Sequence, residues 1–97
     1  MEVGPPAAAV PRSLTVRVAA PDEHAARDLA DGGLLVYEPA VVRARGKWRV
    51  EFRGAAAPAV LIDAIVRSWL RRCGLTATTV TEIRNGAVAR RTVFVRA

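Results

Sequence analysis

Two β-branched runs separated by Asn-Gly constrain this chain more than any other feature. Residues 76–84 and 87–95 are rich in Thr and Val, and Asn85-Gly86 lies between them. This dipeptide is the strongest short hairpin signal, because both residues of the turn need a positive φ angle. The turn predicts an antiparallel hairpin in which Ile83 faces Val88. Alternation leaves the buried face open between two sets: Ile83, Val88 and Phe94, or Val80, Val93 and Val95.

Three more segments have the pattern of strands. Residues 13–19 alternate cleanly, with apolar side chains on one face and Thr and Arg on the other. Residues 47–53 alternate in the same way, which predicts a strand whose aromatic face is buried. Residues 34–38 and 40–45 are apolar and extended, and Pro39 between them indicates one kinked strand near a sheet edge.

Two helices are predicted between these strands. The segment from Pro58 to about Cys73 has an apolar stripe over half its circumference, which is typical of a core helix, and Gly74 suits its end. Trp69 lies within this stripe and, together with Trp48, is expected at the centre of the core. Asp63 and Arg67 lie on the opposite side and are expected to form an i,i+4 ion pair. A shorter helix is expected to begin at Pro21-Asp22-Glu23 and to end at Gly32-Gly33.

The order of these elements is β-α-β-β-α-β with one extra hairpin strand at the end. It resembles the ferredoxin-like arrangement, in which two helices pack on one face of an antiparallel sheet. That resemblance implies an α+β sandwich whose other sheet face is free for water or a partner. We expect residues 1–12 to be a flexible Pro/Ala-rich tail and residues 13–97 to form a single α+β domain.

Charge and composition restrict the class of partner. The chain has a formal net charge of +6, and fourteen of its fifteen cations are Arg, which together with abundant Ala is typical of a GC-rich genome. Residues 1–40 carry three cations and six acids, whereas residues 41–97 carry twelve cations and three acids. Such asymmetry suits a nucleic acid, and equally a head-to-tail partner or an acidic protein partner. One cysteine, no secretory signal and no long apolar run predict a cytoplasmic protein that has no membrane partner.

The sequence predicts no catalytic, cofactor or metal site. His24 and Cys73 are the single histidine and the single cysteine, and they belong to different predicted helices. A nucleophile needs its base within hydrogen-bond reach, and a closed zinc site needs four ligands. An enzyme would require a site built across a dimer interface, with His24 or Tyr37 as the acid–base group.

Residues 45–52, Arg-Gly-Lys-Trp-Arg-Val-Glu-Phe, partly resemble the RNP1 octamer of the RNA-recognition motif. That resemblance implies a sheet face that binds single-stranded RNA by stacking. Here Lys47 and Arg49 stand where the stacking aromatics would be, so only a basic face remains. Such a face suits an ordinary solvated surface, a nucleic acid or an acidic protein partner. The candidate residues for either partner are Arg17, Arg43, Arg45, Lys47, Arg49 and Arg53.

The last 40 residues combine a basic amphipathic helix, ending Ser68-Trp69-Leu70-Arg71-Arg72, with the Thr/Val hairpin. This part resembles the small actinobacterial effector-associated constant-component domains, and the resemblance implies a non-enzymatic adaptor. We therefore predict a protein–protein interaction domain, with a homodimer as one form and a nucleic-acid-binding module as the alternative. The candidate interface is the terminal strand, because sheet edges recruit partners readily: Val88, Arg90, Arg91, Val93, Phe94 and Val95.

Overall fold

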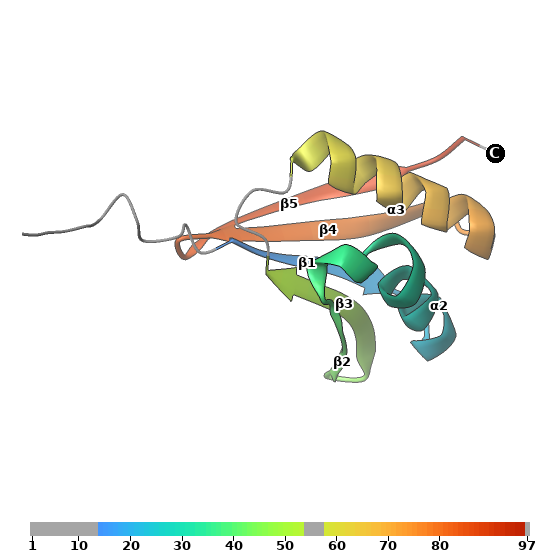
Figure 1. The fold of residues 1–97 in the computed structure, drawn as a ribbon, viewed down its shortest axis with the longest axis horizontal. Coiled ribbons are helices and arrows are strands. Elements are labelled where there is room, and N and C mark those ends of the chain that lie inside the picture. Colours follow the sequence, from blue (N-terminus) through green and yellow to red (C-terminus); the bar gives the residue numbers. More distant parts are fainter. Residues whose placement is uncertain (1–13, 54–57, 97) are drawn as a thin grey trace, which may run out of the picture.

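A five-stranded antiparallel sheet and two helices make up the computed structural model, which describes residues 14–53 and 58–96 (Figure 1). The strands follow the order β2-β3-β1-β4-β5 across the sheet. The predicted α+β class is confirmed, whereas the predicted tail over residues 1–12 lies outside the described residues. The elements are β1 (Leu14–Ala20), α2 (Glu23–Asp28), the π-helical turn η1 (Leu29–Gly33), the 3₁₀ turn η2 (Leu35–Tyr37), β2 (Ala40–Ala44), β3 (Lys47–Arg53), α3 (Ala59–Cys73), β4 (Ala77–Arg84) and β5 (Ala87–Phe94).

Strand β1 lies in the middle of the sheet, and its alternation decides which face the helices cover. Leu14, Val16 and Val18 are buried, while Thr15 and Arg17 are half-exposed. Figure 1 shows α2 and α3 on the same side of the sheet. Successive side chains of a strand point to opposite faces, so one face meets the helices and no described element covers the other.

The two helices are joined at the core by one buried hydrogen bond. The Trp69 indole N–H of α3 donates to the Ala25 carbonyl of α2 at 2.8 Å, and Trp69 is fully buried. A buried indole needs such a partner, because an unsatisfied donor costs about 1–3 kcal/mol. Trp48 is only half-buried, so the expectation that both tryptophans form the core centre is half right.

The C-terminal hairpin has the predicted register. Asn85 and Gly86 have φ angles of 51° and 85°, and Ile83 lies opposite Val88. The structure also resolves the question that alternation left open: Val80 and Val93 are buried against the helices.

Helix α3 begins after Pro58 and ends at Gly74, whose φ of 68° lies in the left-handed region, as predicted. The predicted extended segment over residues 34–38 is wrong. Residues 35–37 form a 3₁₀ turn, and Glu38 adopts a left-handed φ of 53°. Two tertiary contacts override the local pattern here: Leu34 is fully buried, and the Tyr37 ring stacks on Phe52 with centroids 4.9 Å apart.

The close approach of η1 to α3 generates a prediction about Gly33. A Cβ at Gly33 would lie 2.6 Å from the Ile65 Cγ2 atom, whereas a Cβ at Gly32 would meet only the Arg72 guanidinium at 3.6 Å. Gly33→Ala should therefore lower the free energy of unfolding by about 1–3 kcal/mol, through overpacking. Gly32→Ala is the matched control and should be neutral or slightly stabilising, because it only reduces the entropy of the unfolded chain. Urea unfolding measures both, and equal effects of the two substitutions would contradict the assigned contact.

Candidate interaction surfaces

The face of the sheet away from the helices, called here the open face, is rich in cations. Strand register places Arg17 beside Glu51 on one side and beside Thr81 on the other, and Thr81 lies opposite Arg90. In the next row Ala19 lies opposite Arg49. Further along the same face of β3 are Lys47 and Arg53, which are exposed.

Four of the six predicted basic-face residues thus lie on the open face: Arg17, Lys47, Arg49 and Arg53. Of the other two, Arg43 lies on the opposite face, and Arg45 lies in the turn that precedes β3. Arg43 lies opposite Trp48 on the helix side of the sheet, and its guanidinium carbon is 5.6 Å from the centroid of the indole ring. Arg45 occupies the turn between β2 and β3 with a φ of 54°.

Sequence reasoning assigned Arg90 to the edge strand and missed its place on the open face. Two facts together would have placed Arg90 on the open face. The Asn-Gly register puts Arg90 opposite Thr81, and the alternation of side chains along the strands puts Thr81 on the same face as Arg17. This step also requires knowing which side chains of the hairpin are buried, and the sequence left that question open.

Strand β5 is one edge of the sheet and β2 is the other. The Val95 N–H donates to the Thr76 carbonyl at 2.9 Å, which continues the β4–β5 register. Residues of an antiparallel strand alternate between positions that bond to the neighbour and positions that face away from it. The odd-numbered residues of β5 therefore bond to β4. The N–H and C=O groups that face the free edge belong to Val88, Arg90, Thr92 and Phe94.

The side chains of β5 alternate in the same way between the open face and the helix side of the sheet. Val88 and Phe94 are 53% and 61% exposed on the open face, and Arg90 is exposed beside them. Val93 is buried on the helix side. Of the six predicted edge residues, three thus face outward on the open face, while Arg91, Val93 and Val95 face the helices or contact the core.

Arg91 is held by two carboxylates beneath α3. Its guanidinium pairs with Asp63 at 2.6 Å and with Glu82. Burial lowers the pKa of Arg91, but hydrogen bonds to Asp63 and Glu82 outweigh this effect and leave the pKa raised. The predicted Asp63–Arg67 pair is wrong, because Asp63 points toward the sheet and the Arg91 side chain reaches it from β5.

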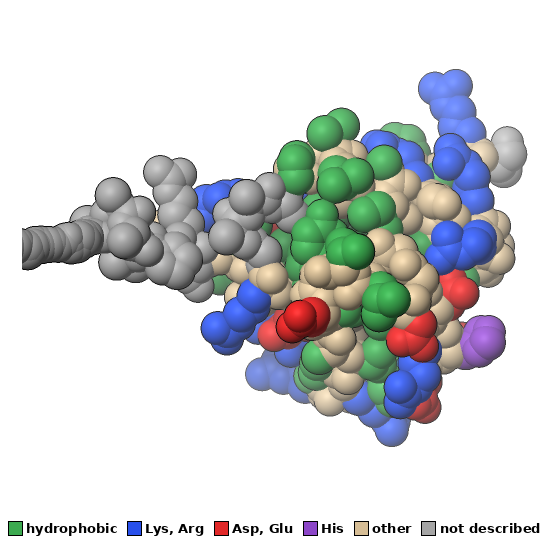
Figure 2. All heavy atoms as spheres, viewed as in Figure 1, with side chains coloured by type: hydrophobic (Ala, Val, Ile, Leu, Met, Phe, Trp, Pro, Cys, Tyr) green, Lys and Arg blue, Asp and Glu red, His purple; other side chains and the backbone are tan. Residues whose placement is uncertain are grey.

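Large apolar side chains are also exposed on the helix side. Leu35 and Val36 of η2 are 61% and 82% exposed, and Val60 and Leu61 of α3 are 77% and 44% exposed. Figure 2 shows hydrophobic side chains gathered over the first half of α3. The predicted apolar stripe of α3 is therefore wider than the surface that the sheet covers.

The titratable groups singled out from the sequence do not form an acid–base site with one another. His24 is exposed in the first turn of α2, and Tyr37 is stacked on Phe52. Burial, followed by the nearby Asp28 carboxylate, raises the pKa of the Cys73 thiol. The thiol lies 3.8 Å from the Asp28 Oδ2 atom, to which it donates. A raised pKa keeps this thiol protonated and poorly nucleophilic at neutral pH.

The described part of the chain shows neither a metal cluster nor a membrane helix. Within residues 14–53 and 58–96, no three His, Cys, Asp or Glu side chains are grouped so that they could hold a metal ion. No helix in the same part is long and apolar enough to cross a membrane.

Comparisons with known proteins add nothing to this geometry. No family model, no curated protein and no solved structure matches the chain. The open face and the β5 edge are the two surfaces whose chemistry is considered below.

The Arg91 network generates a prediction with a neighbouring control. Arg91→Leu leaves Asp63 and Glu82 close together without their cation, and removing one partner of a buried pair costs about 3–5 kcal/mol. Because Arg91 is partly exposed, we expect a smaller loss of about 1–3 kcal/mol in urea unfolding. Arg90→Leu removes the same charge from the adjacent, exposed position, and surface changes of this kind stay within about 0.5 kcal/mol. Comparable losses for the two variants would show that the network does not stabilise the fold.

Proposed function

We propose that this chain is a non-enzymatic protein–protein interaction domain, of the adaptor kind, that forms a homodimer through the free edge of β5. The observation that carries the proposal is that the outward-facing positions of β5 are complementary to themselves when the strand is read in the opposite direction. A single cysteine cannot form a disulfide within the chain, which suits a reducing compartment, and the proposal places the domain in the cytoplasm.

The order of the strands supports a ferredoxin-like assignment of the fold. Strands β1 and β2, which α2 connects, are separated in the sheet by β3. Strands β3 and β4, which α3 connects, are separated by β1. Each strand–helix–strand unit is therefore split by a strand of the other unit, as in the ferredoxin-like arrangement, and β5 extends the sheet beyond it. This extension places β5, and not β4, at the free edge.

Strand β5 is the less protected of the two edges. It has eight residues and contains no proline, whereas β2 has five residues and follows Pro39 directly. Short edge strands and nearby prolines are the usual means of preventing edge-to-edge pairing. Strand addition at an exposed edge gains main-chain hydrogen bonds along the whole strand. The long edge of β5 therefore favours pairing with another strand.

One antiparallel register suits a second copy of β5. If Arg91 lies at the two-fold axis, Val88 faces Phe94 of the second copy and Arg90 faces its Thr92. All four outward-facing residues of each copy then form hydrogen-bonded pairs, and aromatic side chains paired with β-branched ones stabilise a sheet. A shift of two residues in one direction would place Arg90 opposite itself, which is destabilising. A shift in the other direction moves Val88 beyond the partner strand.

On the helix side of this dimer, the charged side chains near the two-fold axis are also balanced. The two Arg91 side chains meet near the axis, and each is already paired with Asp63 and Glu82. Four carboxylates therefore surround two guanidinium groups, which offsets the repulsion between the cations. Pairing through β5 therefore does not bury Arg91 without carboxylate partners.

Light scattering tests the dimer. The wild-type chain should have twice its 10.4 kDa mass, independently of salt, because strand pairing of apolar and hydroxyl side chains depends little on screening. Thr92→Pro removes an outward-facing N–H but no hydrogen bond to β4, so it should weaken dimerisation roughly tenfold or more while the hairpin stays folded. Thr92→Ala is the control and should remain a dimer. A monomeric wild type, or a proline variant with unchanged dimerisation, would rule out this interface.

Disulfide cross-linking tests the register. In a Cys73→Ser background, Val88→Cys combined with Phe94→Cys should form covalent dimers on mild oxidation, because directly opposite residues have Cα atoms about 5.5 Å apart, within disulfide range. Each single substitution is the control and should not cross-link, since neither residue faces itself. Efficient cross-linking of Val88→Cys alone would mean that a different register is formed.

A further inference from the structure

The open face holds more positive charge than its acids neutralise. Glu51 is the one acidic side chain that the five described strands place on this face. Its Oε1 atom lies 3.0 Å from Arg17 Nε and 3.2 Å from Arg49 Nε, so one carboxylate serves two guanidinium groups. Arg90, which lies on the same face, is exposed. The centre of this face therefore carries a surplus of positive charge.

Arg49 has a donor that the fold leaves unsatisfied. Its Nε atom is buried and makes no hydrogen bond of acceptable geometry, even though it lies within ion-pair distance of Glu51. A hydrogen bond depends on direction as well as distance, so Arg49 Nε lies close to Glu51 without donating to it. Glu51 therefore balances the charge of Arg49 by proximity and not by a directed hydrogen bond.

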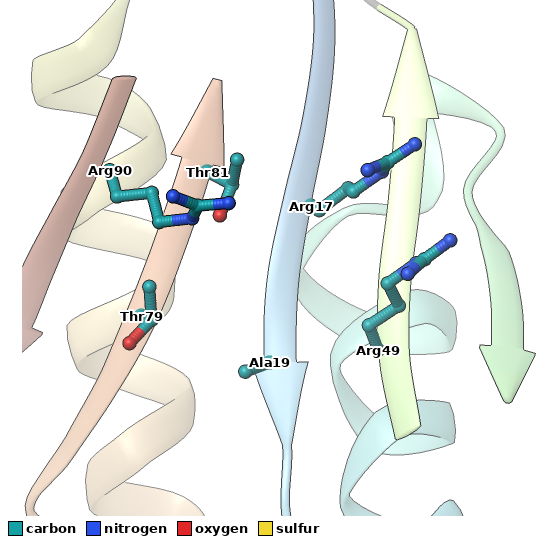
Figure 3. Close-up of a pocket in the computed structure, with 6 residues that line it drawn as sticks. All are labelled: Arg17, Ala19, Arg49, Thr79, Thr81 and Arg90. Atoms are coloured by element: carbon teal, nitrogen blue, oxygen red, sulfur yellow. The ribbon is translucent and has the colours of Figure 1, made fainter. Parts of the chain in front are cut away.

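Two adjoining hollows cross the open face. The first has a volume of about 200 Å³, and its lining includes Ala19, around which the longer side chains stand. Figure 3 shows Arg90 reaching from β5 over β4 toward Thr81, while Arg17 and Arg49 extend from β1 and β3 toward the β2 edge. The second hollow, of about 470 Å³, shares three residues with the first and continues toward the β2–β3 turn. The two hollows are lined together by Arg17, Ala19, Ala44, Arg45, Lys47, Trp48, Arg49, Thr79, Thr81 and Arg90.

We propose that these hollows, called here the basic track, bind the phosphate backbone of a single-stranded nucleic acid that runs across the strands. Five cations along one track favour a chain of phosphates over a single anion, because each phosphate of a polyanion can meet its own cation. The Thr79 and Thr81 hydroxyls can donate to phosphate oxygens, as Ser and Thr commonly do in such complexes. This inference does not depend on the homodimer, since one copy contains the whole track.

The chemistry of the track predicts weak sequence preference. Backbone contacts fix position but carry no sequence information, and aromatic side chains supply the stacking that holds bases. Trp48 is the one aromatic residue that lines the track, and its ring lies on the helix side of the sheet, against the Arg43 guanidinium. Most of the affinity should therefore come from phosphates and fall steeply with salt.

Fluorescence anisotropy with a labelled random single strand tests the inference. A length of about 12 nucleotides is within the usual range of site sizes for such surfaces. Binding should be measurable at about 50 mM salt with a micromolar dissociation constant, and the slope of log K against log salt should be near −0.7 per phosphate contacted. Arg90→Gln and Lys47→Gln lie at opposite ends of the track. Each should weaken binding several-fold and reduce the magnitude of the slope by about 0.7.

Two further variants separate the track from general charge. Arg67→Gln with Arg71→Gln removes two cations from the exposed side of α3 and should leave the affinity within about twofold. Ala19→Leu fills the first hollow without changing charge and should weaken binding about tenfold, with circular dichroism confirming the fold. The inference is overturned if the wild type does not bind at low salt, if the α3 variant loses as much affinity as the track variants, or if a duplex of the same length binds more tightly. Affinity reports on the track and solution mass reports on the dimer. Lys47→Gln and Ala19→Leu lie on β3 and β1, away from the β5 edge, so the track and the dimer can fail separately.

Discussion

The register of the β4–β5 hairpin is the constraint on which both surfaces of this protein depend. A strand has a period of two, so a slip of one residue would turn every side chain of β5 to the other face. The Asn85-Gly86 turn prevents this slip, because its two positive φ angles fix which residues face each other. With that register, Val93 completes the core, and Arg90 and Phe94 are directed away from it. The same choice determines which main-chain groups remain at the free edge.

Adjacent arginines in β5 show how the register assigns different physical roles to identical side chains. Arg91 faces α3 and is held between two carboxylates, while Arg90 faces the open side of the sheet beside Thr81. Composition alone does not distinguish the two residues, because both count toward the high arginine content that is typical of a GC-rich genome. In the structure, one arginine stabilises the packing of α3 on the sheet, and the other contributes to a surface whose charge is not neutralised.

The sequence predicted those features whose causes are local. The hairpin register, the end of α3 at Gly74 and the alternation of β1 depend on a few neighbouring residues and are confirmed. The errors concern tertiary contacts. The helical-wheel prediction considered α3 alone and therefore paired Asp63 with Arg67. In the structure, Asp63 lies where Arg91 can reach it from the sheet. Residues 34–38 have the composition of a strand, but the burial of Leu34 and the stacking of Tyr37 hold them in a turn.

The candidate surfaces could be only half predicted for the same reason. Alternation placed Arg17, Lys47 and Arg49 on one face, but it could not add Arg90 until the buried side of the hairpin was known. Pairing of two copies through β5 would bring two open faces into one continuous ten-stranded sheet, with Arg90 of each copy beside the axis and opposite Thr92 of the other. The basic track would then continue across the dimer instead of ending at β5. A dimer formed by this edge would therefore lengthen the surface available to a polyanion, although each copy holds a complete track.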